Sequence, residues 1–363
     1  MDGPFWIALI PPGTENASST PLSIFDTPTP MSPIPKPRRR SLKGLSLCVV
    51  SLGMLGLSSN PLAEPLAIKA VAEGVYVHQG RHLLPNPENH GEIANIGFIV
   101  GNHCVAVIDT GGSQAQGESL KAAVKATTEV PVCYVINTHV HPDHIEGNRA
   151  FKLPGVKFVG HYRLAAAMAQ RAPYYINQAR DLLGLTLGPD DFIPPDVEVR
   201  ESLDLDLGGR TLHLVAYPTA HTDNDLSVFE SQSKTLWLGD LLFMGHLPVI
   251  DGSLLGWLKV ITQLQSIPAD RVVPGHGPIT ALWPLALTGE KRYLEGLAED
   301  IRAALKANKT IEQAMNEIGH RHRADWQLFD DFHQRNIASG FAELEWEDPS
   351  PEPAMKNPGR SDP

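Results

Sequence analysis

Apolar and polar residues follow one another in short blocks along the chain, and these blocks predict strands that alternate with helices. The β-branched, apolar runs at 103–108 and 132–136 have the length and composition of buried strands. Between them, residues 116–127 show helical spacing, with Leu120 and Val124 on one face. Further strands are predicted within 67–98 and at 157–160, 197–200, 211–217, 235–238 and 271–273.

Three more segments have the pattern of helices. Residues 163–183 form the first, which we expect Pro173 to break, since proline removes a backbone donor. The others are 288–306 and 310–318, the latter with Thr310 as its N-cap. Strands alternating with helices predict α/β layers around one core.

The two ends of the chain have a different composition. Residues 1–30 are rich in Pro, Ser and Thr, and Met31 is predicted to be the true start. Residues 347–363 are predicted to be a disordered tail. We therefore expect three parts: a non-native start plus export signal peptide at 1–63, a catalytic domain at 64–346, and the tail.

The export signal is predicted from the order of basic, apolar and small residues. Four basic residues at 38–43 precede an apolar run at 45–57, and Pro61-Leu62-Ala63 follows. This order is typical of a secretory signal peptide, and the run is too short to span a bilayer comfortably. The alternative is an uncleaved anchor. Residues 39–43 also resemble a twin-arginine signal, so we expect a periplasmic or secreted protein, exported by either route, without a stable membrane anchor after cleavage.

Charge and cysteine content narrow the function classes further. The formal net charge of -11 argues against a partner that is a nucleic acid or an anionic membrane. Cys104 and Cys133 lie in apolar runs, where buried free thiols are common. Export would permit them to pair, but the sequence does not place them within bonding distance. Free thiols are the expectation.

A cluster of histidines and a carboxylate directly follows the strand at 132–136. Alternation along an extended segment puts His139 and His141 on one side, and Pro142 turns the chain before Asp143 and His144. Imidazole and carboxylate are ligands of zinc and similar ions. The alternative, four packed structural residues, is disfavoured because such groups are costly to bury together. The cluster predicts a metal site.

Three later residues also follow predicted strands. They are His221 after 211–217, Asp240 after 235–239, and His276 after 271–273. Open α/β folds bind ligands where strands run into loops. With the cluster they make seven donors, which is enough for two metal ions with an open position.

The segment 139–144 matches the HxHxDH motif of the metallo-β-lactamase superfamily, and the chain resembles that family over 67–278. The resemblance implies an α/β fold, the αβ/βα four-layer sandwich, with C-terminal helices and with the metals at one edge. It also implies that Asp240 bridges two ions. The remaining ligands divide between the ions, His139, His141 and His221 on the first and Asp143, His144 and His276 on the second.

The resemblance also indicates a subfamily. True zinc β-lactamases carry Cys, Ser or another residue in place of Asp240, so this site is more similar to that of the glyoxalase II branch. The stretches 221–227 and 239–248 resemble exported zinc metallohydrolases of quinoprotein dehydrogenase systems. The expected cofactors are two Zn²⁺, with iron or manganese as alternatives, and the expected partners are a small-molecule substrate and a quinoprotein system.

The resemblance implies a hydrolase that cleaves an ester, thioester or amide bond with a hydroxide held between the ions. Asp143 is the candidate catalytic residue, which would orient the nucleophile or take its proton. His246 either contacts substrate or caps a loop. Two other functions stay open: an iron-dependent sulfur oxygenase acting on a persulfide, and a periplasmic accessory protein with structural metals.

Overall fold

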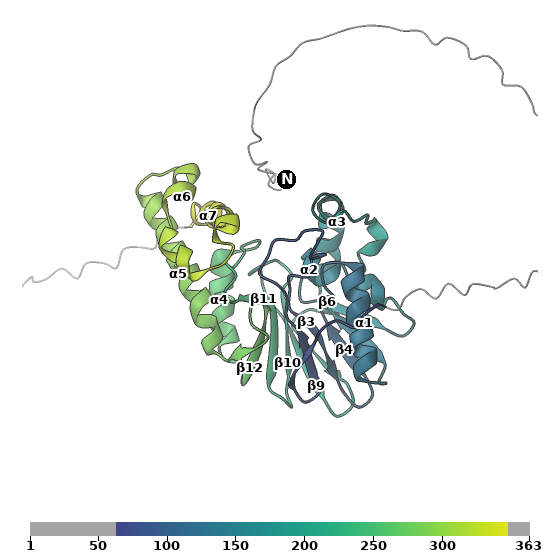
Figure 1. The fold of residues 1–363 in the computed structure, drawn as a ribbon. Helices are drawn as coiled ribbons and strands as arrows, with labels where there is room; N and C mark the ends of the chain where they lie inside the picture. Colours follow the sequence, from purple (N-terminus) through teal and green to yellow (C-terminus); the bar gives the residue numbers. More distant parts are fainter. Residues whose placement is uncertain (1–62, 348–363) are drawn as a thin grey trace, which may run out of the picture. The chain divides into compact units, whose positions relative to one another are not determined.

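The structure is a computed structural model that describes residues 63–347 (Figure 1). The predicted start at Met31, nearly all of the export signal and nearly all of the C-terminal tail lie outside the described residues. Among the described residues, no helix has the length and apolar character that crossing a membrane requires.

Two β-sheets form the centre of the described chain. The first has seven strands in chain order: β1 (Lys69–Ala72), β2 (Val75–His78), β3 (Ile96–Val100), β4 (Val105–Ile108), β5 (Val132–Ile136), β6 (Lys157–His161) and β7 (Val197–Val199). The second has the order β13-β12-β11-β10-β9-β8, namely β13 (Ala281–Leu282), β12 (Arg271–His276), β11 (Thr235–Phe243), β10 (Leu226–Glu230), β9 (Thr211–Ala216) and β8 (Ser202–Asp206).

Helices connect the strands that run parallel. Strands β4 to β7 pair in parallel, as do β11 and β12, whereas the other pairs are antiparallel. A parallel pair needs a crossover connection, because the chain must return to the same end of the sheet. The crossovers carry α1 (Gln114–Thr127), α2 (Pro142–Ile145), α3 (Leu164–Gln178) and α4 (Leu254–Leu264). After β13 the chain forms α5 (Thr288–Lys306), α6 (Ile311–Glu317) and α7 (Phe329–Leu344).

Alternation along the strands divides the core into layers. In β4, Ala106 and Ile108 pack between the two sheets with Trp237 of β11, while Val105 and Val107 pack in the cluster that includes α1. A third cluster joins β11 to α4, α5 and α7. Figure 1 shows α1 on one side of the strands and α4 and α5 on the other. The predicted four-layer sandwich with C-terminal helices is confirmed.

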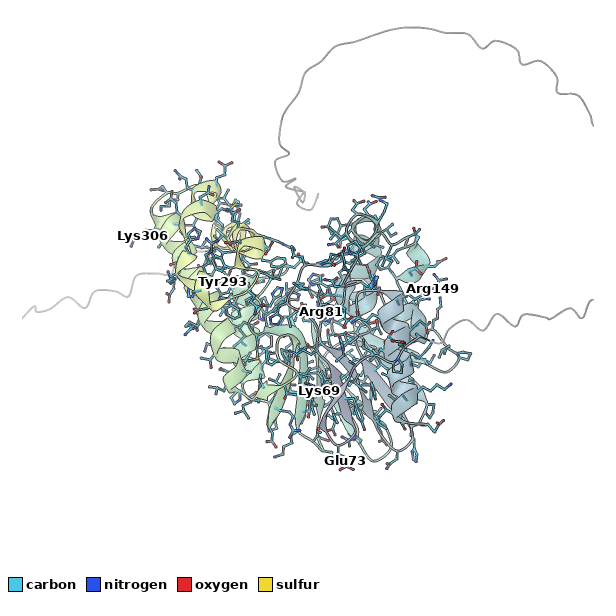
Figure 2. The ribbon with its side chains drawn as sticks, in the orientation of Figure 1. Lys69, Glu73, Arg81, Arg149, Tyr293 and Lys306 are labelled. Atoms are coloured by element: carbon cyan, nitrogen blue, oxygen red, sulfur yellow. A yellow bond between two sulfur atoms is a disulfide. The ribbon has the colours of Figure 1, made fainter. Side chains whose placement is uncertain are left out.

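The side chains are buried or exposed according to these layers (Figure 2). Tyr293 on α5 is fully buried, whereas Arg149 and Lys306 are exposed and point outward. Helix α5 has the predicted bounds, and Thr310 caps α6 by accepting a hydrogen bond from the Gln313 backbone, as predicted.

The predicted break at Pro173 is wrong, because α3 runs through this residue to Gln178. Met168 and Tyr175, one before and one after the proline, pack in the same buried cluster. Their burial holds the helix together across the missing backbone donor. The helical path then continues through Ala179–Leu183, as the pattern had indicated.

The expectation of two free thiols is also wrong. Cys104 and Cys133 form a disulfide, and their Cα atoms are 5.6 Å apart. Cys104 immediately precedes β4 and Cys133 lies in β5, its parallel neighbour. The sequence spacing of the two cysteines did not indicate that these strands are adjacent.

Candidate metal centre

The seven candidate ligands lie at one edge of the sandwich, each on a segment that leaves or interrupts a strand. His139 and His141 follow β5, and α2, which starts at Pro142, carries Asp143 and His144. Proline at the first position of α2 suits a helix start, because that position needs no backbone donor. The other three candidates come from the second sheet: His221 after β9, Asp240 within β11, and His276 at the end of β12.

Asp240 lies inside its strand, not at the end as predicted. Strand β11 continues to Phe243, and its pairing with β12 shifts register around Gly239. Gly239 has φ +50°, a conformation that favours glycine, so the strand kinks there and turns Asp240 toward the site. Gly275 on β12 leaves room for the carboxylate, since a Cβ at that position would lie 2.0 Å from Asp240 Oδ1.

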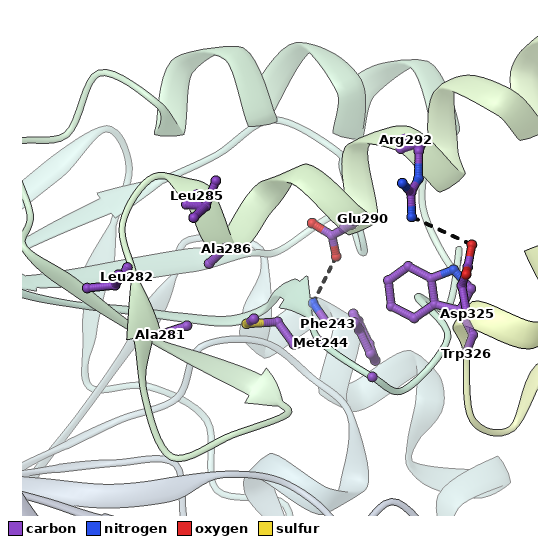
Figure 3. Close-up of a pocket in the computed structure, with 12 residues that line it drawn as sticks. Phe243, Met244, Ala281, Leu282, Leu285, Ala286, Glu290, Arg292, Asp325 and Trp326 are labelled. Carbon is purple, nitrogen blue, oxygen red and sulfur yellow. Dashed lines mark hydrogen bonds and ion pairs between the residues drawn. The ribbon is translucent and has the colours of Figure 1, made fainter.

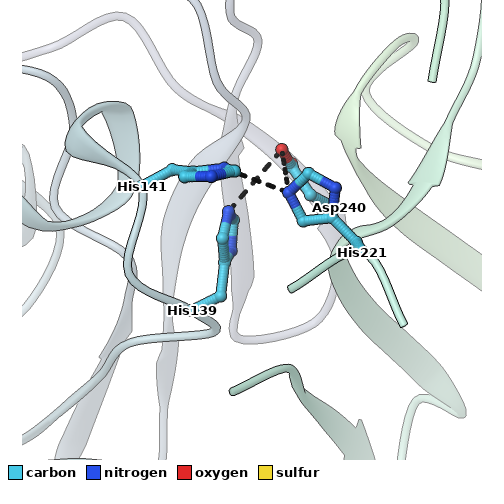
Figure 4. Close-up of side chains that lie close together, drawn as sticks. All are labelled: His139, His141, His221 and Asp240. Atoms are coloured by element: carbon cyan, nitrogen blue, oxygen red, sulfur yellow. Dashed lines mark hydrogen bonds and ion pairs between the residues drawn. The ribbon is translucent and has the colours of Figure 1, made fainter. Parts of the chain in front are cut away.

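The ligand atoms form two groups. The first group contains His139, His141, His221 and Asp240, with all ligand atoms within 4.8 Å of one another (Figure 4). Asp240 Oδ2 lies 3.4 Å from His221 Nε2 and 3.7 Å from His139 Nε2. In Figure 4 the three rings and the carboxylate point toward a common centre.

The second group contains Asp143, His144 and His276, and it adjoins the first through Asp240. Asp143 Oδ2 is 3.2 Å from His276 Nε2 and 3.5 Å from His144 Nε2. Asp240 Oδ1 lies 3.2 Å from His144 Nε2, and Oδ2 lies 3.5 Å from His276 Nε2. One carboxylate therefore faces both groups, in the position that was predicted for a bridge.

Two of the five rings are oriented by backbone carbonyls. His221 Nδ1 is 2.7 Å from the Val249 carbonyl, and His276 Nδ1 is 3.0 Å from the Ile93 carbonyl. A carbonyl can only accept, so both Nδ1 atoms carry the hydrogen. Each Nε2 therefore presents a lone pair to the site.

The other three rings are oriented by side chains. Asp109 accepts from His144 Nδ1 at 2.8 Å and from the Thr138 hydroxyl at 2.8 Å, which leaves that hydroxyl to accept from His139 Nδ1 at 3.1 Å. A carboxylate also orients His141, whose Nε2 donates to Asp251 Oδ2 at 3.0 Å. In their neutral forms all five rings thus direct a nitrogen lone pair toward the site.

These buried lone pairs fit a bound cation. His139 Nε2, His144 Nε2 and Asp240 Oδ1 are buried without a hydrogen-bond partner, which is costly unless another group satisfies them. His141 Nδ1 and His221 Nε2 face each other at 3.0 Å, and both carry lone pairs in the tautomers just assigned. A divalent ion between such donors removes both penalties.

The charges within the site are strongly coupled. Burial alone would raise the pKa of Asp143, but His144 and His276 lower it to about 2. Burial lowers the pKa of His221 to about 3. It acts on His276 in the same direction, yet Asp240 and Asp143 raise that pKa to about 9. Asp240, Asp143 and Asp109 also raise the pKa of His144 well above its ordinary value, although burial opposes this. Without metal, His276 is therefore positively charged at neutral pH, with a second ring proton on Nε2, whereas His221 is neutral.

Two residues of the site were missed from the sequence. Asp109, which directly follows β4, has φ +54°, a strained conformation for a residue other than glycine and one that often marks functional sites. Asp251 lies in the loop between β11 and α4. Each contacts a histidine that is distant in the sequence: Asp109 contacts His144, 35 residues away, and Asp251 contacts His141, 110 residues away. The Asp-Thr-Gly-Gly turn after β4 was the signal that could have identified Asp109.

His246 lies beside the second group, with its ring 5.0 Å from that of His276. Its Nδ1 donates a hydrogen bond to the Leu247 carbonyl at 2.6 Å, which supports the predicted role of His246 in capping a loop. Contact with substrate stays a prediction.

A cavity of about 430 Å³ adjoins this edge but is separate from the seven side chains, none of which lines it (Figure 3). Its wall includes Glu290, which accepts a hydrogen bond from the Phe243 backbone at 2.9 Å, and Trp326. The Phe243 ring in turn stacks on the His276 ring, with 5.0 Å between the ring centroids. The cavity is therefore a neighbour of the site and not the site itself.

The model of the metallo-beta-lactamase superfamily matches residues 91–276, which include all seven candidate ligands. The chain belongs to the metallo-beta-lactamase superfamily. This assignment and the His/Asp cluster together indicate that the protein binds divalent metal.

The metallo-beta-lactamase relatives include enzymes with different substrates. A linear primary-alkylsulfatase from Pseudomonas sp. is 24% identical over 208 residues, which are 47% of this chain but only 39% of the sulfatase. A metallo-beta-lactamase type 2 from Bacteroides fragilis is 24% identical over 234 residues, 62% of this chain and 85% of the relative. Both names denote hydrolases, which supports an enzymatic function for this chain.

Solved structures agree on the fold. The structure of a metallo-beta-lactamase from Pontibacter korlensis is similar with a TM-score of 0.52 and 24% sequence identity. The match covers 63% of this chain and 99% of that one. At this identity the likeness shows the metallo-beta-lactamase fold and does not extend to the substrate.

Proposed function

We propose that the protein is a dinuclear metal-dependent hydrolase of a small-molecule ester, thioester or amide. The observation that carries this proposal is the convergence of seven buried or half-buried donor atoms, with the Asp240 carboxylate facing both groups. His139, His141 and His221 would hold one ion, and the second group would hold the other. The nitrogen-rich donor set favours zinc.

The chemistry divides between the ions and the chain. When bound, two divalent ions supply Lewis acidity and a water of lowered pKa. Asp143 keeps 15% of its side chain exposed and is ionised at neutral pH, because its pKa is lowered to about 2. It would orient the attacking water or take its proton through the carboxylate. Asp240 stays ionised too, since the neighbouring histidines hold its pKa well below the ordinary value even though burial opposes this.

The substrate class rests on the family and on the site together. The two relatives act on different bonds, as their names state: an alkyl sulfate ester in one case and a β-lactam amide in the other. Because the chain spans 39% of the alkylsulfatase, that substrate is carried over only as a candidate ester. We further propose export to the periplasm and action beside a quinoprotein dehydrogenase system, supported by the signal-like residues 38–63 and by the stretches 221–227 and 239–248.

Elemental analysis and a hydrolysis screen test the proposal. We expect close to two zinc ions per chain and turnover of at least one ester, sulfate ester, thioester or β-lactam. Asp143→Asn should stay folded and lose roughly 10²–10⁴-fold in turnover, whereas Asp190→Asn, at an exposed residue outside the site, should not. Stoichiometric iron with oxygen uptake on a persulfide would replace the hydrolase by the sulfur oxygenase. Metal without turnover on any substrate class would favour an accessory protein.

A further inference from the structure

We propose that Asp251, held between Arg171 and Arg335, is the positioning residue that fixes His141 as a metal ligand and connects α3 and α7 to the metal centre. This inference rests on the proposed function, because it assigns a role in metal binding. We call the four residues Asp251, Arg171, Arg335 and His141 the Asp251 clamp.

The Asp251 carboxylate accepts from three side chains. Oδ2 accepts from His141 Nε2 at 3.0 Å and from the Arg171 guanidinium. Oδ1 accepts from Arg335 Nη2 at 2.8 Å. The backbone N–H of Asp251 also donates to the His221 carbonyl at 3.1 Å. A single residue thus contacts two of the three histidines in the first group.

His141 depends on this contact more than the other rings depend on theirs. It is the most exposed of the five, at 17% of its side chain, and no backbone carbonyl orients it. Without a fixed acceptor at Nε2, its ring is free to exchange tautomers and to rotate. Because both carboxylate oxygens of Asp251 already accept from arginine donors, Asp251 also accepts from His141, which puts the hydrogen on Nε2 and keeps the Nδ1 lone pair opposite His221 Nε2.

The two arginines hold that carboxylate in place. Asp251 has only 10% of its side chain exposed, and each of its oxygens meets a guanidinium group, Oδ2 that of Arg171 and Oδ1 that of Arg335. Charge-assisted hydrogen bonds of this kind are stronger than neutral ones and restrict the geometry of the carboxylate.

The arginines come from helices on different sheets. Arg171 lies on α3, the crossover between β6 and β7, and Arg335 lies on α7 near the C-terminal end of the described chain. In Figure 1 these helices lie near the top, on opposite sides. An aspartate that served only to join two helices would need no histidine. The His141 contact gives the clamp its role in the metal centre.

Cobalt titration of the full-length protein, stripped of metal, tests the clamp. We expect Asp251→Ala to weaken cobalt binding at the first group by about 10–100-fold and to change the visible spectrum of the cobalt ion bound there. Cobalt binding at the second group should stay as in the wild type. Asp251→Asn keeps an acceptor for His141 but loses the negative charge. The cobalt affinity of its first group should therefore lie between those of the wild type and of Asp251→Ala. Arg335→Gln, at a half-exposed side chain, should weaken the first ion several-fold and preserve the fold.

The matched control is Arg302→Gln, which breaks a surface ion pair with Glu347 and should bind cobalt as the wild type does. Folded Asp251→Ala with wild-type affinity and spectrum would overturn the clamp while leaving the hydrolase proposal intact. If Asp251→Ala does not fold, wild-type binding by Arg335→Gln would overturn it. A wild-type protein that binds no cobalt would overturn the proposed function, and the clamp with it.

Discussion

At the residue scale, the metal centre depends on the absence of a side chain at Gly275. A Cβ there would lie 2.0 Å from Asp240 Oδ1, which is closer than two non-bonded atoms can approach. Gly275→Ala should therefore displace the carboxylate, reduce bound metal, and lower the free energy of unfolding by roughly 1–3 kcal/mol. Elemental analysis and urea denaturation measure the two effects.

Gly188→Ala is the matched control, since its backbone has φ -127° and the nearest atom to a new Cβ is 3.9 Å away. Equal metal content in the Gly275→Ala and Gly188→Ala proteins would show that the position of Asp240 does not govern metal binding.

Protonation of His276 should make metal binding depend on pH. Its pKa is raised to about 9 by Asp240 and Asp143, although burial opposes this, so the ion must displace a proton below that pH. The pKa of His144 in the same group is also raised well above its ordinary value by Asp240, Asp143 and Asp109, although burial opposes this. Affinity at the second group should therefore fall about tenfold per pH unit below pH 9 for each proton displaced. His221, with a pKa lowered to about 3 by burial, is already neutral and adds no such dependence at the first group.

Zinc competition titrations between pH 6 and pH 9 measure this difference, and proton release in weak buffer at pH 7 counts the displaced protons. Binding of both ions with the same pH dependence would contradict the assignment of the displaced protons to the second group.

At the scale of elements, helix α7 stabilises the start of α4. Glu343 on α7 accepts from the Ser253 hydroxyl at 2.6 Å and from the Leu254 backbone N–H at 2.7 Å, at the positive end of α4. Glu343→Gln should lower the free energy of unfolding by about 1–2 kcal/mol. Urea denaturation measures the change, with Glu345→Gln at an exposed position as the control. Equal losses in the two variants would show that the contact does not stabilise the fold.

The sequence predicted some elements with their observed bounds and missed others. Val132–Ile136 and Thr288–Lys306 have the predicted bounds. Helix α4 was missed although its buried residues, among them Leu254, Trp257 and Ile261, recur with helical spacing. Helix α7 was missed because His333 and Asn336, both polar, are on its buried face.

For the site, the motif and the strand ends identified all seven side chains that the structure brings together. The kink that keeps Asp240 inside β11 could not be predicted, because glycine after a short apolar run reads equally well as a strand end. The turn at Asp109 marks that residue but does not indicate its partner, which follows the neighbouring strand β5. Asp251 could not be found from spacing either, because its contact with His141 depends on how the two sheets pack, and no local pattern records that.

At the scale of the whole molecule, the candidate ligands link the two sheets. His139 to His144 follow β5 of the first sheet, whereas His221, Asp240 and His276 come from the second. Bound metal would therefore cross-link the layers in the folded state, where an unfolded chain has no preformed site. Binding to the folded state alone stabilises it by RT ln(1 + [L]/Kd), about 2.7 kcal/mol at a free metal concentration of 100 Kd.

Removing the metal should therefore lower the melting temperature of the entire sandwich. We expect chelation with EDTA, followed by removal of the chelator, to shift a single unfolding transition to lower temperature. Zinc should restore it, whereas magnesium should not, because the site offers mainly imidazole nitrogen and magnesium prefers oxygen ligands. Differential scanning calorimetry measures the shift. A melting temperature that neither EDTA nor zinc changes would mean that the lone pairs at the sheet edge are satisfied without metal, and the cross-link between the layers would have to be abandoned.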